Sequence, residues 1–170
     1  AQGIRTSSNE VYVVDGRTRG PGNVRAFSSQ LQQEVALERD CLLNFLQGKE
    51  IKAYRLSHSG KLVIVPYRPA PDVTELIPET ELRSRFPLTW AYLMQNRTAL
   101  ESREGGRMKG SGWYGYVYPK NLDIMLRPKI LVPDIADKAS FAIDEQGEYA
   151  FTSGYAIVLD DSLEVSPKYI

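Results

Sequence analysis

"RPKILVPDIADKASFAIDEQGEYAFTSGYAIVL", residues 127–159, carries the strongest strand signals in the chain. Three apolar runs lie at 129–132, 140–143 and 155–159, and a fourth short run at 149–151 follows the turn sequence DEQGE. Short runs rich in branched and aromatic side chains, separated by polar and glycine-containing turns, are typical of strands. The stretch therefore predicts a mainly antiparallel sheet in the C-terminal part of the chain.

The clearest helical pattern lies just before this sheet, in residues 79–104. Five side chains fall at the spacing of one helix face: Trp90, Leu93, Met94, Arg97 and Leu100. This spacing predicts a long helix, and Pro87 suits its first turn, where a missing N–H costs nothing.

The N-terminal half adds further strands. Residues 11–14 predict a strand, the Gly- and Pro-rich residues 16–27 a loop, and residues 33–38 a possible second strand. Residues 53–56 and 61–65 predict the two arms of a hairpin that turns at Ser59 and Gly60.

A short helix is predicted in RDCLLNFLQG. Asp40 is its candidate N-cap, Leu42, Leu43 and Leu46 form its apolar face, and Gly48 follows its end. Together these elements predict an α+β fold for residues 1–170. We expect one domain with a mainly antiparallel sheet, one long helix and one or two short helices.

Composition and charge narrow the class of protein. The content of hydrophobic (42%) and charged (25%) residues is ordinary for a globular domain. The net charge is zero, but residues 97–129 hold seven Lys and Arg against three Asp and Glu, whereas residues 130–170 hold two against eight. A neutral total can therefore hide a basic face. No apolar stretch reaches the ~20 residues that a membrane span needs.

The chain has one cysteine, Cys41, and one histidine, His58. No disulfide is possible within one chain, and one residue of each kind does not form a typical zinc site. These counts favour a reducing, cytoplasmic compartment, no bound metal and a buried Cys41. The chain begins without a methionine, which indicates a fragment of a longer polypeptide.

Motifs for catalysis are missing from the sequence. It contains no GxGxxG, no GxxxxGK[ST], no HExxH and no GxSxG. A small stand-alone hydrolase remains an alternative, and it requires His58, Cys41 or carboxylates to converge in one pocket. We predict no catalytic residue in this chain.

Residues 100–122, LESREGGRMKGSGWYGYVYPKNL, combine glycine, positive charge and aromatic rings. Lys and Arg bind phosphates, and Arg also pairs with guanine edges. Glycine permits close approach, and rings brace a loop or stack on a base. The stretch fits a nucleic-acid-binding loop, but it also fits a connecting loop whose Trp113 and Tyr114 are ordinary core residues. A protein-interaction module that docks a basic partner on the acidic residues 130–170 is a further alternative.

The order of several segments resembles a known family. These segments are GIRTSSNEVYVV (3–14), LERDCLLNFLQGKEIKAY (37–54), KLVIVPY (61–67), FPLTWAYLMQNRTALESR (86–103), the stretch from Trp113 to Tyr149, and SPKYI (166–170). In this order they resemble the C-terminal specificity, or target-recognition, domain of TaqI-like and Eco57I-like N6-adenine DNA methyltransferases. The resemblance covers nearly the whole chain.

The resemblance implies a division of labour with a separate catalytic domain. In such enzymes that domain precedes the specificity domain, binds S-adenosylmethionine and holds a flipped adenine in an NPPY-type loop. No NPPY motif exists in these 170 residues. The resemblance therefore implies a bacterial restriction-modification or phage-defence enzyme in which this chain binds double-stranded DNA, without a cofactor of its own. An endonuclease on the same polypeptide is a further possibility in this family.

Site residues follow from the loop and the resemblance together. Arg107 and Lys109 are candidates for base-edge or phosphate contacts, and Lys120 and Asn121 for phosphate or adenine-edge contacts. Arg103 has two rival roles, a phosphate contact or an ion pair with Glu104 or Asp123. Trp113 and Tyr114 are expected to brace the loop against the long helix. Arg5 and Thr6 are expected near the joint with the catalytic domain.

Overall fold

A computed structural model describes residues 1–18, 22–68 and 74–158 of the chain. Its centre is a six-stranded sheet in the order β12-β4-β7-β1-β2-β3, in which only β12 and β4 run parallel. The strand bounds are β1 Val13–Gly16, β2 Asn23–Ser28, β3 Gln33–Glu38, β4 Leu42–Gln47, β7 Lys61–Ile64 and β12 Tyr149–Thr152.

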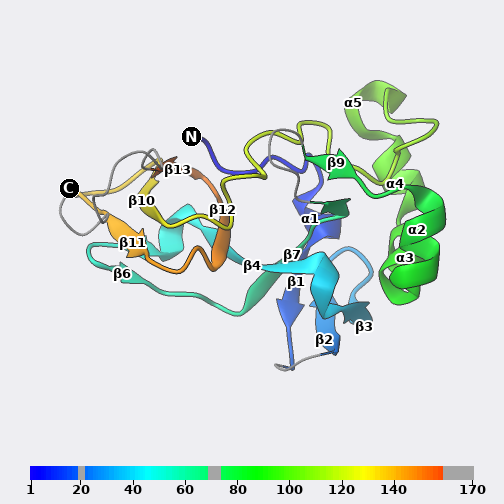
Figure 1. The fold of residues 1–170 in the computed structure, drawn as a ribbon, viewed down its shortest axis with the longest axis horizontal. Helices are drawn as coiled ribbons and strands as arrows, with labels where there is room; N and C mark the ends of the chain where they lie inside the picture. Colours follow the sequence, from blue (N-terminus) through cyan, green and yellow to red (C-terminus); the bar gives the residue numbers. More distant parts are fainter. Residues whose placement is uncertain (19–21, 69–73, 159–170) are drawn as a thin grey trace.

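A three-stranded antiparallel sheet lies at one end of the molecule, and helices lie at the other (Figure 1). The smaller sheet contains β11 Ala142–Asp144, β10 Lys129–Pro133 and β13 Gly154–Ile157. Two ribbons complete the described strands: β5 Ile51–Lys52 with β6 Arg55–Leu56, and β8 Tyr67–Arg68 with β9 Glu75–Leu76. The α+β class with a mainly antiparallel sheet is confirmed.

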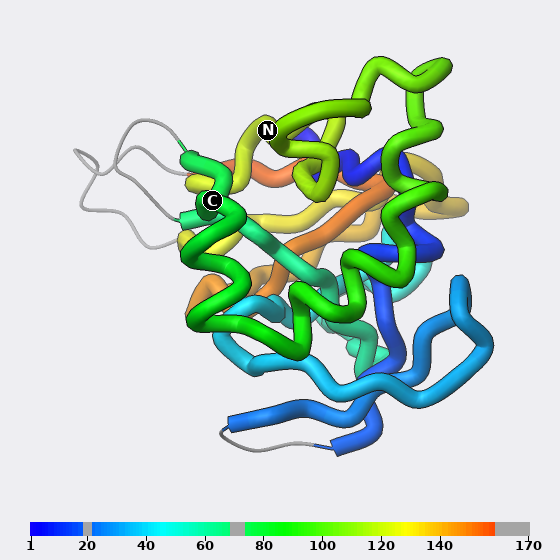
Figure 2. Tube along the Cα trace, turned by 90° about the vertical axis from the view of Figure 1, so that its right-hand side faces the viewer, coloured from blue at the N-terminus to red at the C-terminus, as the bar shows by residue number. Residues whose placement is uncertain are grey.

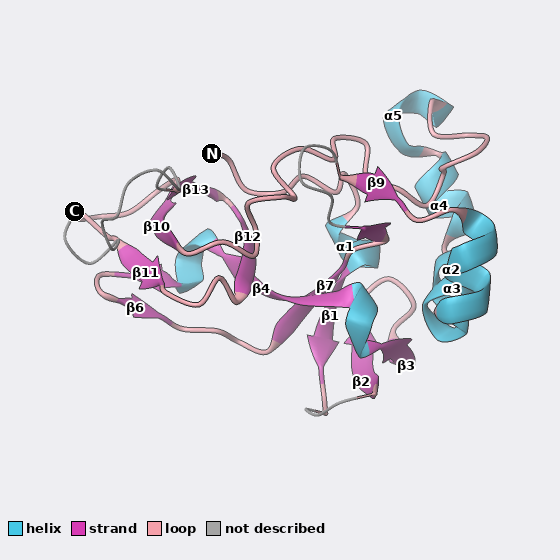
Figure 3. Cartoon of the chain, viewed as in Figure 1, coloured by secondary structure: helices cyan, strands magenta, loops and turns pink. Residues whose placement is uncertain are grey.

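The helical region is in four pieces rather than one continuous helix. They are α2 Glu79–Arg85, α3 Pro87–Gln95, α4 Arg97–Glu101 and α5 Arg103–Gly106, and a short α1 Asn9–Tyr12 precedes β1. Pro87 does occupy the first turn of α3, as predicted. It also separates α3 from α2, because Phe86 between them has non-helical backbone angles (φ −132°, ψ 58°) and proline has no N–H to continue the ladder. Figures 2 and 3 show the pieces gathered beside the sheet.

The start of α3 is capped from a distant strand. Glu38, at the end of β3, accepts hydrogen bonds from the backbone N–H groups of Leu88 and Thr89, both at 2.8 Å, and from the Thr89 hydroxyl at 2.6 Å. Free N–H groups and a partial positive charge at a helix N-terminus favour such a carboxylate. This cap fixes the helices to the edge of the sheet.

The predicted helix at RDCLLNFLQG is wrong. Asp40 lies in a single 3₁₀ turn, Arg39–Cys41, and the following residues form strand β4, which pairs with both β7 and β12. Leu42 and Leu46 are both buried, as a central strand requires. A second 3₁₀ turn, Gly48–Glu50, ends the segment.

Other boundaries also shift. Val11 and Tyr12 belong to α1, and the predicted loop at 16–27 ends early because β2 begins at Asn23. The hairpin arms exist as strands but with different partners: β6 pairs with β5, and β7 pairs with β1 and β4. The final predicted run reaches residue 159, and the segment SPKYI lies at 166–170. Residues 159–170 are outside the described part of the chain.

Candidate nucleic-acid interface

The glycine-rich stretch is anchored by a buried Trp-Tyr-Gly-Tyr segment, residues 113–116. Trp113 and Tyr114 are almost fully buried, and their rings lie 5.7 and 5.5 Å from the ring of Trp90 on α3. Ring centroids at this separation and tilted relative to one another are favourable aromatic contacts. The two side chains thus lie between the loop and a helix, where a bracing role requires them.

Tyrosine hydroxyls hold the backbone of this segment. Tyr12 donates to the carbonyl oxygens of Tyr114 at 2.8 Å and Gly115 at 3.0 Å, while Tyr67 accepts from the Tyr116 N–H at 2.6 Å. A Cβ at position 115 would lie 2.9 Å from the Tyr67 hydroxyl, so only glycine fits there without displacement. The segment is consequently a rigid base for the residues that precede it.

These buried tyrosines predict a loss of stability in alkali. Burial raises the pKa of Tyr67 to about 12, and it raises the pKa of Tyr12 further. In the unfolded chain tyrosine titrates near pH ~10, so above that pH the unfolded state loses protons that the folded state keeps. The contribution of these two tyrosines to stability is therefore fully present below about pH 10 and falls as the pH rises towards 12, by about 1.4 kcal/mol per pH unit for each of them.

Urea unfolding at a series of alkaline pH values measures this decline. Tyr67→Phe should make the decline shallower, because phenylalanine has no proton to lose. Equal slopes in the two proteins would contradict the assignment.

Arg103 is turned into the protein, which corrects both of the roles expected for it. Its guanidinium donates to four carbonyl oxygens, those of Leu100 (2.7 Å), Thr6 (3.1 Å), Trp113 (2.7 Å) and Gly115 (2.9 Å), and the residue is only 8% exposed. It has no carboxylate partner among the described residues. Carbonyl dipoles thus take the place of the predicted ion pair, and the burial of the residue leaves little of its guanidinium accessible to a phosphate.

Arg107 and Lys109 lie on the turn that follows α5, and both are exposed. The chain reverses here through positive φ angles at Glu104, Gly105 and Gly106. Figure 1 shows α5 and this turn projecting beyond the other helices. In the described part of the chain neither cation forms an ion pair. The turn therefore presents two uncompensated positive charges on a rigid base.

Arg5, Thr6, Lys120 and Asn121 lie where the N-terminal segment meets the end of the loop. Arg5 forms an isolated β-bridge with Tyr118, and the Asn121 side chain donates to the Gln2 carbonyl at 3.0 Å. Thr6 is buried and donates to the Asn9 side chain at 2.7 Å, whereas Arg5 and Lys120 are exposed. Arg5 and Lys120 thus give this junction two exposed cations, a second basic group in addition to Arg107 and Lys109.

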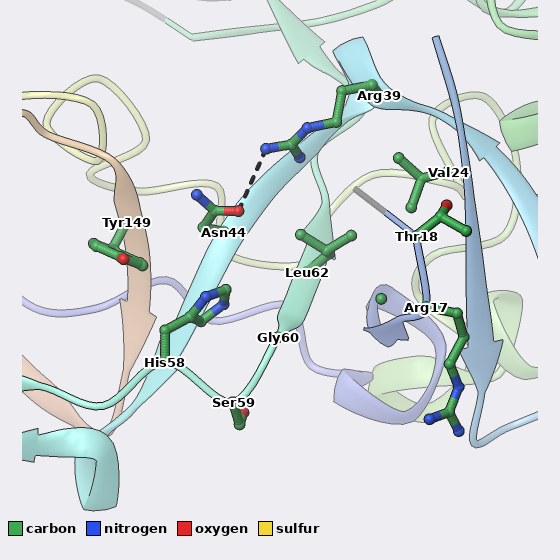
Figure 4. Close-up of a pocket in the computed structure, with 11 residues that line it drawn as sticks. Arg17, Thr18, Val24, Arg39, Asn44, His58, Ser59, Gly60, Leu62 and Tyr149 are labelled. Atoms are coloured by element: carbon green, nitrogen blue, oxygen red, sulfur yellow. Dashed lines mark hydrogen bonds between the residues drawn. The ribbon is translucent and has the colours of Figure 1, made fainter. Parts of the chain in front are cut away.

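Sequence reasoning missed a polar groove on the face of the six-stranded sheet (Figure 4). The groove has a volume of about 650 Å³ and no carboxylate among its lining residues. Arg17, Arg39, Asn44, His58 and Tyr149 line it, and Arg39 donates to the Asn44 side chain at 3.3 Å. No local signal reveals this groove, because its residues come from five strands, β1, β2, β4, β7 and β12, and from the segments between them.

The hydrolase alternative finds no support in the positions of Cys41 and His58. Burial raises the pKa of the Cys41 thiol to about 12, which keeps it protonated and unreactive. His58 contacts the Lys61 carbonyl at 2.8 Å and the Tyr149 ring, not Cys41. Within the described ranges, no three His, Cys, Asp or Glu side chains are placed to hold a metal ion, and no helix has the length and hydropathy to cross a membrane.

Comparison with known proteins relates the chain to type II methyltransferases. It is 24% identical over 159 residues to the type II methyltransferase M.BstVI of Geobacillus stearothermophilus, a match that covers 92% of this chain. It is 34% identical over 64 residues, 38% of the chain, to the type II methyltransferase M.BanIII of Aneurinibacillus aneurinilyticus. The matched parts are 24% and 11% of those proteins, and no family model matches the chain.

Proposed function

We propose that this chain is a DNA target-recognition domain of the TaqI-like specificity type. It reads a sequence in double-stranded DNA and presents the duplex to an N-terminal domain of the same polypeptide. That domain binds S-adenosylmethionine and methylates adenine at N6. The kinship with type II methyltransferases, of which the chain matches only a quarter in the case of M.BstVI, supports a role that complements a catalytic domain.

The observation that carries the proposal is the pair of exposed cations, Arg107 and Lys109, on a rigidly anchored turn. A loop that enters a DNA groove has to hold its shape, and here Arg103 and the buried aromatic segment fix both of its ends. Arg is suited to guanine edges, and Lys to phosphates. Because neither Arg107 nor Lys109 pairs with a carboxylate of the described residues, both positive charges are available to bind DNA.

The second basic group and the groove offer further cations that can bind phosphates. We assign phosphate contacts to Lys120 and to Arg17 and Arg39 of the groove, which lacks carboxylates. Asn121 keeps its side-chain oxygen for an adenine amino group while its nitrogen donates to Gln2. Arg5 and Thr6 belong to the segment that leads from the preceding domain, and the chain contributes no catalytic residue.

The protein-interaction alternative is weaker, because part of the acidic charge in residues 130–158 is internal. Asp144 is buried and paired with Lys129 at 2.6 Å, so it is not available to a basic partner. The acidity of this segment in the sequence therefore overstates the negative charge that its surface offers.

The double variant Arg107→Ala/Lys109→Ala tests the proposal. We expect weaker binding to short DNA duplexes, with the slope of log affinity against log salt reduced by about 0.9 for each phosphate that the variant no longer neutralises. Fluorescence anisotropy at several salt concentrations measures both quantities. Selection of a randomised duplex pool on the wild-type chain should also enrich one sequence, and the variant should not enrich it.

Arg83→Ala/Arg85→Ala is the matched control, since both arginines are exposed on α2 and pair with glutamates there. The control should retain wild-type affinity and salt slope. An unchanged slope in the Arg107/Lys109 variant, or no enriched sequence for the wild type, would overturn the proposal.

A further inference from the structure

A tyrosine occupies a strained and fully exposed position at the tip of the β5–β6 hairpin. The register pairs Lys52 with Arg55, so Ala53 and Tyr54 form a two-residue turn. Tyr54 has a φ of 61°, a region in which tyrosine is uncommon and which glycine usually fills. The residue is 95% exposed, so packing of its ring does not offset the strain.

The hairpin is held by its backbone rather than by the tyrosine ring. The Tyr54 N–H donates to the Phe141 carbonyl at 2.7 Å, which ties the tip to the segment before β11. The strained angle is thus imposed from outside, and the ring points away from the protein with no structural task. Strain retained in this way is a recognised mark of functional positions.

The surroundings of Tyr54 are strongly basic. Lys52 and Arg55 flank it, and Lys49, Lys138 and Asp137 line the adjoining hollow of about 710 Å³. None of these four cations has an ion-pair partner among the residues described. Positive charge around an exposed aromatic ring is the combination that binds unpaired nucleotides.

The one acid within the hairpin segment is withdrawn from its surface. Glu50 is 5% exposed, and its carboxylate accepts the N–H groups of Gln47 at 2.8 Å and Ser59 at 2.7 Å. The acid shapes the base of the hairpin, while every charge on the outer side of the hairpin is positive. The sequence GKEIKAYR therefore presents three exposed cations, Lys49, Lys52 and Arg55, and no exposed carboxylate.

We propose that the β5–β6 hairpin is a second DNA contact, at which the Tyr54 ring stacks on a base that has left the duplex stack, while Lys52 and Arg55 bind the flanking phosphates. The inference rests on the proposed function and adds to it a preference for distorted DNA. An enzyme that acts on a flipped base has to stabilise an opened duplex, and the energy of unstacking is lowest where a base is already unpaired. The hairpin and α5 lie towards opposite ends of the long axis in Figure 1, and an extended duplex spans such a separation.

The test compares a fully paired duplex with the same duplex carrying one unpaired base. Wild type should prefer the unpaired-base duplex on the order of tenfold, the scale of one base stacked on an aromatic ring. Tyr54→Ala should abolish this preference, and Tyr54→Phe should retain it, since stacking needs the ring and not the hydroxyl. Tyr54→Gly, which suits a positive φ, should lose the preference without lowering the melting temperature.

Arg107→Ala separates this inference from the proposed function. It should weaken binding to both duplexes and leave their ratio unchanged. Suppose that the wild type binds both duplexes equally and that Arg107→Ala weakens both. The hairpin contact would then be wrong, while the proposed function would stand. A Tyr54→Ala variant with the wild-type ratio would lead to the same conclusion. A wild type that binds neither duplex would overturn both proposals.

Discussion

Asp144→Asn is expected to destabilise the protein by about 3–5 kcal/mol, the scale measured when one member of a buried ion pair is removed. The Asp144 carboxylate lies 2.6 Å from the Lys129 ammonium, and both side chains are almost completely buried. An amide cannot balance the positive charge, and its NH₂ group would compete with the ammonium as a donor. Burial already lowers the pKa of Lys129, which shows how little solvation the site supplies. Urea or thermal unfolding measures the loss.

The pair matters because it joins several segments. Lys129 on β10 also donates to the carbonyl oxygens of Met125 and Arg127, while Asp144 on β11 accepts the N–H groups of Glu148 and Tyr149. Glu148 and Tyr149 lead directly into β12, which pairs with β4 of the central sheet. Loss of the charge therefore loosens the connection between the two sheets as well as the smaller sheet itself.

Two further variants make this prediction falsifiable. Asp134→Asn repeats the substitution on an exposed acid near the same sheet, and it should change stability by less than about 0.5 kcal/mol. Lys129→Met combined with Asp144→Asn removes the unpaired charge and keeps an acceptor for the backbone, so it should regain much of the loss. If Asp144→Asn were as stable as Asp134→Asn, the buried pair would not be an important contact.

The sequence predicts the class of fold better than its individual elements. The runs near residues 129–157 form strands because their turns are local and their side chains are rich in β-formers. The segment from Leu42 to Gln47 is wrongly predicted because its apolar positions fit either a helix or a strand. What decides its structure is distant: β7 and β12 pair with it from either side. Pairing partners of this kind cannot be deduced from local periodicity.

The candidate site shows the same limit. Exposed positions such as Arg107 and Lys109 are accessible to sequence reasoning, because charge and glycine content mark a loop directly. Arg103 is not, since its role depends on carbonyl oxygens of Thr6 and Gly115, which the fold brings to it. Sequence reasoning also misses Tyr54, because neither its positive φ nor the burial of Glu50 beneath it is encoded in a motif.

Arg103→Met should destabilise the protein by about 3 kcal/mol or more, because hydrogen bonds to a charged group contribute about 1.5–3 kcal/mol each and are not additive. Burial of the guanidinium is tolerated only because four carbonyl oxygens and the face of the Tyr12 ring, 5.5 Å away, surround it. Methionine fills the space but leaves those oxygens without donors. The stability of Arg103→Lys should lie between those of Arg103→Met and the wild type, since an ammonium keeps the charge but cannot reproduce the planar fork of the guanidinium.

The same substitution should release the basic turn, because Arg103 joins the start of α5 to Thr6 and to the buried segment at Trp113. Limited trypsin digestion should therefore cut after Arg107 and Lys109 faster in Arg103→Met than in wild type, and affinity for DNA should fall even at temperatures where the variant is folded. Arg97→Met is the matched control: Arg97 lies over the ring of Trp113 at 5.1 Å but is exposed and pairs with Glu101, an arrangement that contributes about 0.3–0.5 kcal/mol. Equal stability and equal cleavage of the two variants would show that the buried guanidinium does not fix the turn, and the rigid presentation of Arg107 and Lys109 would then need another cause.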